Sequence, residues 1–305
     1  MVAATNPIGN RVSALAAACD QVAFGQDRWL VMTATPRQAY LLLIATLIAS
    51  LPSCGVTPSD PIPEHKILTL QSKALSEPRR ITVYTPIAYG ENPEQRFPVL
   101  YMPDGGIQED FPHVVATIKG LIASDAIPPM LVVGIENTQR RRDLTGPTAV
   151  AEDRLVAPVV GGSKSFRAFV KHELIPEVEQ RYRCNEQRAI VGESLAGLFV
   201  VETLLLEPKL FDCYIAISPS LWWNDHWLVR NAKDLLQGRD GHPVRLFLSH
   251  GNEADIVGHA EELVRHIRAS APRSLSCVYE PHPEEQHHTI FRAVKEQAFR
   301  AVLSK

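Results

Sequence analysis

Short apolar runs recur along the chain after about residue 66, and longer stretches with helical periodicity separate them. The runs are brief and often β-branched, which is typical of strands that a sheet buries on both faces. The predicted strands span residues 67–70, 81–84, 99–102, 131–135, 189–191, 214–217, 246–248 and 276–279. The predicted helices span residues 111–124, 166–182, 195–206, 254–269 and 289–303. This alternation predicts parallel crossovers, with helices on both faces of one sheet.

The first two predicted strands have no helix between them. The polar segment "SEPRR" (76–80) contains a proline and joins them, so an antiparallel hairpin is expected. A hairpin followed by alternating strands and helices is the order of an α/β-hydrolase. The predicted fold class is therefore α/β, with an α/β-hydrolase fold built on a single, mostly parallel, twisted sheet.

The front of the chain has a different pattern. Residues 39–51, "AYLLLIATLIASL", form 13 uncharged residues after Arg37. A membrane span needs about 20 apolar residues, so this run has the length of a signal-peptide core. Export is predicted, to the periplasm of a bacterium or to its membrane as a lipoprotein. Residues 1–31 carry Asp20 and Asp27, which suit an export signal poorly, so Met32 fits better than Met1 as the true start.

The segment "LPSC" (51–54) is similar to a bacterial lipobox, whose cysteine becomes lipidated, although Pro52 departs from the usual pattern. A lipid anchor at Cys54 and plain cleavage with release both remain open, with a buried core helix as a third alternative. The predicted organisation is an N-terminal extension with the signal segment (1–54), a proline-rich tether (55–65) and a folded domain (66–305).

Composition narrows the class of partner. The chain has 45% apolar residues and a formal net charge of −3 at pH 7, which argues against a nucleic-acid-binding surface. Arg140, Arg141 and Arg142 form the only tight basic cluster, and a solvated loop is the favoured interpretation. They lie in a long polar stretch (138–165) with little regular pattern, which is typical of a functional or disordered loop.

The cysteines beyond the signal segment, Cys184, Cys213 and Cys277, lie in strand-like runs and are expected to be small buried hydrophobic residues. An exported location would permit a disulfide between Cys184 and Cys213. No cysteine pair has metal-ligand spacing, and neither a metal nor an organic cofactor is predicted.

Candidate chemistry begins at "VGESLAGL" (191–198). A serine nucleophile on this fold is marked by G-x-S-x-G at a turn between a strand and a helix. Ser194 has Gly192 before it, but Ala196 occupies the second glycine position and Gly197 comes one residue late. The apolar strand before Ser194 and the apolar helix after it favour a nucleophile, and an ordinary serine N-cap is the alternative.

The partners that a serine nucleophile needs follow in the order acid, then histidine. Glu253 and Asp255 come after the strand predicted at 246–248. After the strand predicted at 276–279, His282, His287 and His288 come directly before the last helix.

From about residue 67 onward, the chain resembles the esterase D-like family of α/β-hydrolases, which includes the enterochelin (siderophore) esterases. The resemblance rests on "FPVLYMPDGG" (97–106), "VVGIENTQRRRDLTGP" (132–147), "RAIVGESLAGLFVVETLLLEPKLFDCYIAISPSLWW" (188–223) and "EEQHHTI" (284–290). It implies that Ser194 is the nucleophile and His287 the base, with His288 its neighbour. His282, in a proline-flanked turn, is expected at the surface.

The resemblance does not identify the acid, because Ala254 holds the position of the family's carboxylate. Asp255 is favoured, since a short side chain at a helix start would be well fixed. Glu253 remains open, as does a serine–histidine dyad.

Two further parts of the site are expected. The N–H of Leu195 and that of Gly105 or Gly106 would form the oxyanion hole. Trp222 and Trp223 would line the substrate pocket, with ordinary core aromatics as the alternative. The resemblance also offers the arginine cluster as a means to steer an anionic substrate.

Together these expectations describe a serine esterase that cleaves small-molecule carboxylic esters through an acyl-enzyme. The alternatives are a siderophore-lactone hydrolase, an acyltransferase on the same site, or a catalytically weak lipoprotein that binds ligands with this fold.

Overall fold

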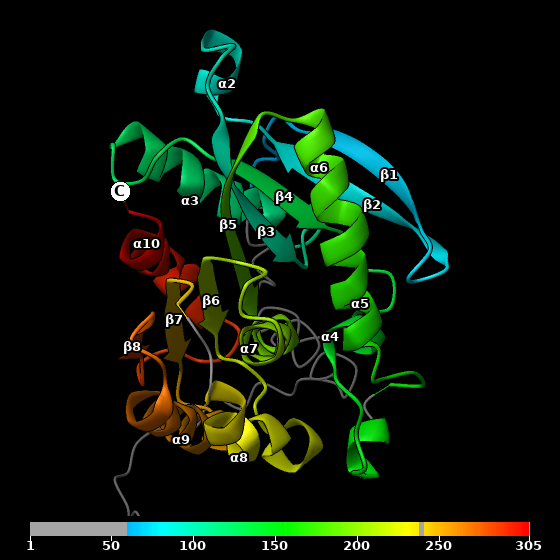
Figure 1. Ribbon diagram of the computed structural model, residues 1–305, viewed down its shortest axis with the longest axis vertical. Coiled ribbons are helices and arrows are strands. Elements are labelled where there is room, and N and C mark those ends of the chain that lie inside the picture. The colour runs from blue at the N-terminus through cyan, green and yellow to red at the C-terminus, as the bar shows by residue number, and fades with distance from the viewer. Residues whose placement is uncertain (1–59, 156, 238–240, 305) are drawn as a thin grey trace, which may run out of the picture. The chain divides into compact units, whose positions relative to one another are not determined.

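The computed structural model describes residues 60–155, 157–237 and 241–304 (Figure 1). The extension and signal segment expected at 1–54, with Met32 and Cys54, lies outside these residues, as does the start of the tether. The described residues belong to one compact unit, Pro58–Lys305. None of their helices is long and apolar enough to span a membrane.

One sheet of eight strands carries the fold, in the order β1-β2-β4-β3-β5-β6-β7-β8. The strands are β1 (Lys66–Ser72), β2 (Glu77–Tyr84), β3 (Phe97–Pro103), β4 (Leu131–Ile135), β5 (Cys184–Glu193), β6 (Cys213–Ile217), β7 (Val244–His250) and β8 (Leu275–Pro281). The β1–β2 and β2–β4 pairs are antiparallel and the other pairs are parallel. Each predicted strand falls within one of these, and the predicted α/β-hydrolase fold is confirmed.

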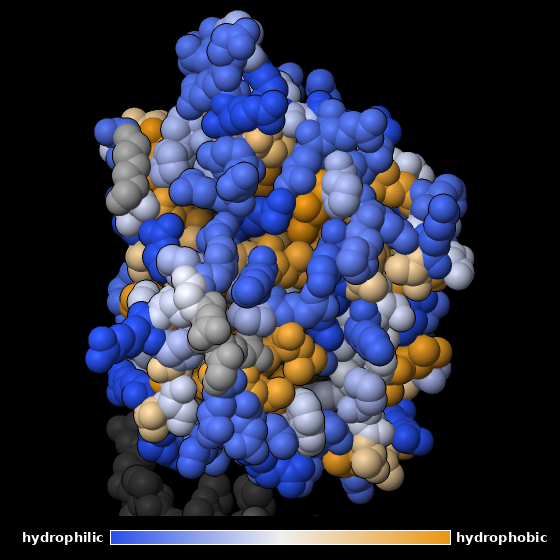
Figure 2. Space-filling view, viewed as in Figure 1, coloured by the Kyte–Doolittle hydropathy of each residue, from blue (hydrophilic) through white to orange (hydrophobic). Residues whose placement is uncertain are grey.

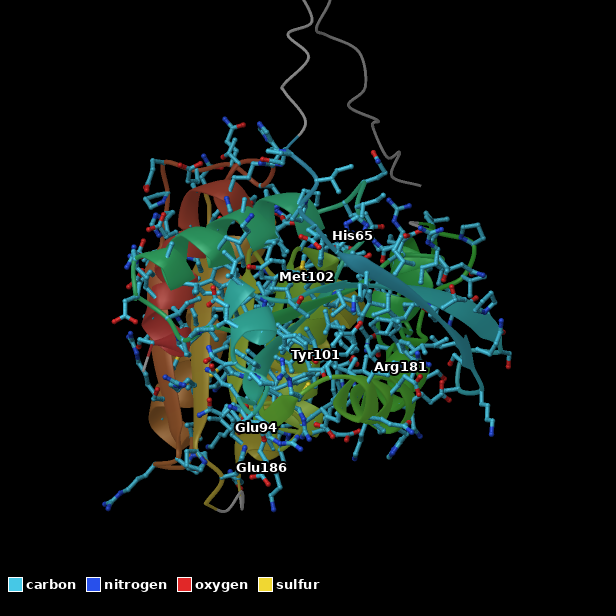
Figure 3. The ribbon with its side chains drawn as sticks, turned by 90° about the horizontal axis from the view of Figure 1, so that it is seen from above. His65, Glu94, Tyr101, Met102, Arg181 and Glu186 are labelled. Carbon is cyan, nitrogen blue, oxygen red and sulfur yellow. The ribbon has the colours of Figure 1, made fainter. Side chains whose placement is uncertain are left out.

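The central strands bury both faces, because successive side chains point to opposite sides of a sheet. On β3, Val99 and Tyr101 face one apolar core, while Leu100 and Met102 face the other. Figure 3 shows Tyr101 and Met102 in the middle of the fold, with helices on both sides.

Two layers of helices cover the sheet (Figure 1). The core behind Met102 is closed by α3 (Phe111–Ala123) and α10 (Ile290–Leu303). The helices on the opposite face are α5 (Ser163–Phe169), α6 (Ile175–Arg181), α7 (Leu195–Leu206), α8 (Trp223–Leu236) and α9 (Ala254–Ser270). The outer surface seen in Figure 2 is mostly hydrophilic, with apolar side chains visible in hollows between polar ones.

Several helices differ from the prediction. The helix expected at 166–182 is divided into α5, a π-helical turn (η2, Val170–Leu174) and α6. Pro176 explains the division, because it has no N–H to bond to the carbonyl of His172. The α8 helix and the short α2 (Ile87–Glu91) were not predicted.

The stretch expected to be an irregular loop (138–165) contains the short helices α4 (Arg140–Leu144) and η1 (Glu152–Leu155) before α5 begins. Two arginines of the cluster in it, Arg140 and Arg142, are half-buried in ion pairs, which corrects the favoured interpretation of a solvated loop for them, whereas Arg141 is exposed. Arg140 forms a bidentate ion pair with Asp104, at 2.7 and 2.8 Å. Arg142 pairs with Glu77 at 2.7 Å, which ties α4 to the start of β2.

Cys184 and Cys213 are free in the structure, so they do not form the disulfide that an exported location would permit. Both are buried, as expected, and Cys277 is half-buried.

Candidate active site

Ser194 lies in the turn between β5 and α7. Its backbone has φ 60° and ψ −121°, a conformation that costs energy for any residue with a side chain. Its side chain makes no N-cap hydrogen bond, so the hydroxyl is not used to cap α7. This geometry is that of a nucleophile elbow rather than of an ordinary helix start.

The small residues around Ser194 fit this elbow for steric reasons, although Gly197 comes one position later than the motif requires. A Cβ placed on Gly192 would lie 2.5 Å from the backbone carbon and oxygen of Ala196, so position 192 tolerates no side chain. The methyl of Ala196 fits because Gly192 has none. Gly197 allows α7 to approach β6, since a Cβ there would lie 3.0 Å from the carbonyl oxygen of Ile217.

His287, in the loop between β8 and α10, connects the serine to a carboxylate. Its Nε2 lies 2.9 Å from the Oγ of Ser194, and its Nδ1 lies 2.9 Å from Oε1 of Glu253. A carboxylate only accepts hydrogen bonds, so Nδ1 carries the proton of the neutral ring. The lone pair on Nε2 is then free to accept the serine hydroxyl, as a general base must.

The carboxylate that contacts Nδ1 of His287 is Glu253 and not Asp255, the residue favoured from the sequence. Glu253 stands before α9 in an extended conformation, with φ −69° and ψ 115°. Its side chain is one methylene longer than that of aspartate and reaches back to the imidazole. Asp255 lies one residue into the helix and is exposed to solvent.

Backbone hydrogen bonds hold the loops of Glu253 and His287 together. The N–H of Asn252 donates to the carbonyl of Glu285 at 3.0 Å. Gly251 allows this contact, because a Cβ there would lie 2.6 Å from the same carbonyl oxygen. Ser218, at the end of β6, donates its hydroxyl to Oε1 of Glu253 at 2.9 Å. Three strand ends therefore fix the carboxylate.

The N–H groups expected to form the oxyanion hole differ in their hydrogen bonding. Leu195 opens α7, so its N–H belongs to the first turn, whose donors have no partner within the helix. The N–H of Gly105 donates to the carbonyl of Ile135 at 3.0 Å, and that of Gly106 donates to Glu109 at 2.7 Å. Neither glycine N–H is free in this arrangement, because each already has an acceptor.

Trp223 is buried, and its indole N–H donates to the carbonyl of Gly146 at 2.8 Å. It therefore anchors the segment between α4 and η1, as a structural residue would. Trp222 is half-buried beside it, with ring centroids 5.9 Å apart. Their lining of a substrate pocket stays a prediction.

Comparison with known proteins identifies the family. The "Putative esterase" family model matches residues 72–297. The chain belongs to this esterase family. The resemblance inferred from the sequence is confirmed, and so is the expectation of an ester hydrolase.

Two relatives of the esterase carry the names of siderophore esterases. Ferri-bacillibactin esterase BesA of Bacillus subtilis is 27% identical over 232 residues, which cover 69% of this chain and 80% of BesA. Siderophore triacetylfusarinine C esterase of Aspergillus fumigatus is 29% identical over 228 residues, covering 68% of this chain and 75% of that protein. Among solved structures, an IroE-like serine hydrolase from Shewanella oneidensis is 25% identical with a TM-score of 0.71, covering 79% and 80% of the two chains.

The esterase carries a second carboxyl against its histidine that sequence reasoning missed. Oε1 of Glu193 lies 3.3 Å from Nε2 of His287. Burial raises the pKa of Glu193 to about 8, and the nearby Arg140 only partly offsets this. Its position directly before the nucleophile was the one available signal.

Three other polar residues at or after the ends of β6 and β7 were also missed. Ser220 is buried, with its Oγ 3.4 Å from that of Ser194. His250 is buried and bonds the hydroxyl of Tyr279 through Nε2 at 2.7 Å. Ser218 and Ser220 come from the segment "SPSLWW", whose serines between a strand and two tryptophans could have drawn attention.

His282 and His288, the other two histidines between β8 and α10, form no hydrogen bond with Ser194 among the contacts that the structure describes. His282 is half-buried and pairs with Glu284 at 3.0 Å, and His288 is exposed. Among the residues that the structure describes, no group of three or more His, Cys, Asp or Glu side chains could hold a metal ion.

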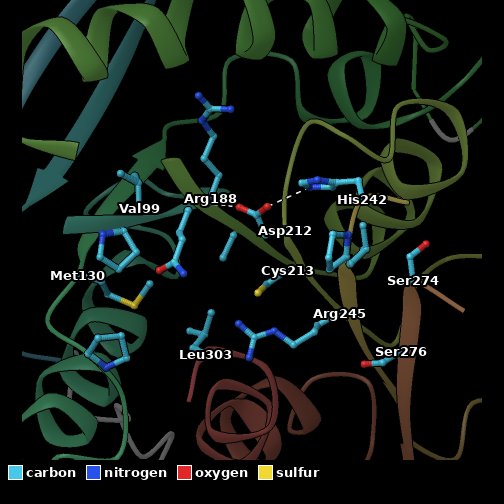
Figure 4. Close-up of a pocket in the computed structure, with 16 residues that line it drawn as sticks. Val99, Met130, Arg188, Asp212, Cys213, His242, Arg245, Ser274, Ser276 and Leu303 are labelled. Carbon is cyan, nitrogen blue, oxygen red and sulfur yellow. Dashed lines mark hydrogen bonds and ion pairs between the residues drawn. The ribbon is translucent and has the colours of Figure 1, made fainter. Parts of the chain in front are cut away.

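A cavity of about 370 Å³ lies at the amino ends of the parallel strands, at the other end of the strands from Ser194 (Figure 4). Three of its charged or titratable side chains, His242, Asp212 and Arg188, form ion pairs within the protein, and Arg245 donates a hydrogen bond to the carbonyl of Ser304 at 3.3 Å. His242 pairs with Asp212 at 3.0 Å, and Arg188 pairs with Glu179 at 2.5 Å. Ser194, His287 and Glu253 instead lie at the carboxyl ends of the strands, where ligands bind in sheets of this type.

Proposed function

We propose that the protein is a serine esterase that hydrolyses siderophore esters through an acyl-enzyme. The observation that carries the proposal is the chain of contacts from Ser194 through His287 to Glu253, with 2.9 Å at each step. The strained backbone of Ser194 supports it, because strain of this kind is retained at functional sites.

In this mechanism, Oγ of Ser194 attacks the ester carbonyl while Nε2 of His287 takes its proton. Glu253 stabilises the imidazolium that forms. The N–H of Leu195 stabilises the oxyanion. When the tetrahedral intermediate collapses, the C–O bond to the alcohol breaks and His287 returns the proton to the leaving oxygen. Water, activated by the same histidine, then releases the acid and restores Ser194.

Hydrolysis is favoured over acyl transfer because solvent reaches the base. The side chain of His287 is 42% exposed, so water is available to attack the acyl-enzyme. The alternative of a binding protein without catalysis was suggested by Ala254, which stands where the family has its carboxylate. It is disfavoured, because the carboxylate of Glu253 contacts His287 instead. The siderophore class comes from the relatives, which are named for bacillibactin and triacetylfusarinine C.

The test is labelling with a fluorophosphonate, followed by a substrate panel. One residue should be labelled, and Ser194→Ala should abolish both the label and ester hydrolysis. The panel would contain a short p-nitrophenyl ester, bacillibactin and triacetylfusarinine C, with and without iron. Labelling that survives Ser194→Ala would contradict the nucleophile, and cleavage of the simple ester alone would contradict the siderophore class.

We also propose that the protein is exported and carries a lipid at Cys54. The support is the uncharged run at 39–51 followed by "LPSC". A fatty-acid analogue should label the protein in its native host, and Cys54→Ala should remove the label. A mature N-terminus at another residue, without label, would instead indicate cleavage and release.

A further inference from the structure

A buried carboxyl oxygen without a hydrogen-bond partner lies against the catalytic base. Among the described residues, Oε1 of Glu193 is enclosed and accepts no hydrogen bond. The side chain of Glu193 is 17% exposed, and this oxygen is 3.3 Å from Nε2 of His287. An unpaired buried carboxylate is costly, so the group either keeps a proton or shares one with a neighbour.

The number of protons that the His287 ring can hold shows that Glu193 and Ser194 compete for the same nitrogen. With the Nδ1 proton committed to Glu253, Nε2 has one site for a proton, and two oxygens face it. The Oγ of Ser194 is at 2.9 Å and Oε1 of Glu193 is at 3.3 Å. A proton between Glu193 and His287 would occupy the lone pair that Ser194 needs.

The charges around Glu193 favour retention of that proton. Asp104 directly after β3, Asp110 directly before α3 and Glu253 directly before α9 all disfavour a further negative charge. Arg140 of α4 is the one cation among the main influences on Glu193, and its guanidinium already pairs with Asp104. Burial acts in the same direction as the three carboxyls.

We propose that Glu193 and His287 hold one proton between them, and that Nε2 becomes available to Ser194 only when the pair loses it. Glu193 is then a positioning residue that acts through His287. This inference rests on the proposed serine-esterase function. Once ionised, Glu193 also stabilises the imidazolium that forms during the reaction, because an opposite charge at this distance favours the charged form.

The experiment compares the pH profile of kcat/KM for the wild type and Glu193→Gln. In the wild type, the carboxylate of Glu193 should place the acid limb of the kcat/KM profile at a higher pH than in Glu193→Gln. In Glu193→Gln, its midpoint should move to lower pH by about one unit or more, as expected for removal of a charge within about 4 Å. The value of kcat/KM on the alkaline plateau should also fall in Glu193→Gln. This fall should be no larger than tenfold for each pH unit by which the midpoint moved.

Glu186→Gln is the matched control, since it removes a carboxyl from the same strand at an exposed site. Its profile should follow that of the wild type. Glu193→Asp keeps the charge on a shorter side chain and should restore part of the displacement. This second variant keeps the proposal testable if Glu193→Gln folds poorly.

A second readout does not depend on catalysis. The imidazole signals of His287, assigned by their loss in His287→Asn, can be titrated by NMR in the full chain. Their midpoint should fall in Glu193→Gln relative to the wild type, even if Ser194 proves inactive. An unchanged midpoint in a folded Glu193→Gln protein, in both the profile and the titration, would overturn the proposal.

Discussion

Glu253 and Asp255 differ by two positions in the chain and by one methylene in length, and these differences decide which of them reaches His287. Glu253 precedes α9 and extends toward β6, where Ser218 donates to the oxygen that also accepts from His287. Asp255 lies within the first turn of α9 and points to solvent. The length of the glutamate compensates for its early position.

Glu253→Gln should therefore lower kcat strongly while Asp255→Asn leaves it nearly unchanged. An amide cannot stabilise the imidazolium, and it can present its NH₂ group to Nδ1, which favours the wrong tautomer. A loss of roughly 10²- to 10⁴-fold is expected from the behaviour of serine triads. The measurement is kcat on a p-nitrophenyl ester with both variants at matched folding.

Two outcomes would contradict this assignment. Small, equal losses in both variants would indicate a serine–histidine dyad. A large loss in Asp255→Asn alone would mean that the loop before α9 rearranges when substrate binds.

Among single residues, those that directly follow a predicted strand and have a reactive side chain could be predicted from the sequence. Ser194 and His287 were predicted as nucleophile and base from their types and their order in the chain, and the structure brings them into contact. The preferred acid, Asp255, is not the carboxylate that contacts Nδ1 of His287, because that contact depends on the reach of a side chain around a turn. Glu193 gave no signal beyond its place directly before Ser194, since a carboxyl becomes unusual only when the fold encloses it beside a base.

The elbow is the element that holds Ser194 in its strained conformation. Its geometry depends on the contact between Gly192 at the end of β5 and Ala196 in the first turn of α7. The two positions tolerate different changes, because only one of them lacks room for a methyl group.

Gly192→Ala should destabilise the protein by about 1–3 kcal/mol or more, since its Cβ would overlap backbone atoms of residue 196. It should also reduce kcat by displacing Ser194. The matched variant Ala196→Gly restores the usual motif, and should cost only about 1 kcal/mol, the effect of glycine in a helix. Urea unfolding and kcat would be measured on both. A milder effect of Gly192→Ala than of Ala196→Gly would contradict the packing argument.

Elements with a strong apolar pattern could be predicted, and those held by tertiary contacts could not. All eight strands were located, because strands buried on both faces carry apolar residues throughout. The α8 helix was not predicted, and its first turn is irregular, because Asn224, Asp225 and His226 have left-handed backbone conformations. Contacts with the segment before α5 stabilise this turn, including a 2.8 Å hydrogen bond from the N–H of Asn224 to Asp153.

For the whole molecule, two carboxyls of opposite tendency shape the dependence of stability on pH. The hydrogen bond from Arg142 is the main cause that lowers the pKa of Glu77 to about 2, and Thr138 and Arg79 contribute. Glu77 therefore stabilises the fold above pH 4.5, and this contribution is lost as the pH falls toward 2. It joins β2 to α4 and opposes acid unfolding.

Glu193 acts in the opposite direction, because its pKa in the folded state is raised to about 8 from an ordinary value of 4.5. Between these values the folded state binds more protons than the unfolded state, so the free energy of unfolding decreases as the pH rises. Glu193→Gln removes this decrease. Relative to the wild type, the variant should gain stability from pH 5 to 8, by on the order of a few kcal/mol, since one pKa unit corresponds to about 1.4 kcal/mol. Urea unfolding at a series of pH values checks this, with Glu186→Gln as the control, and parallel curves for wild type and Glu193→Gln across that range would show that Glu193 is ionised throughout.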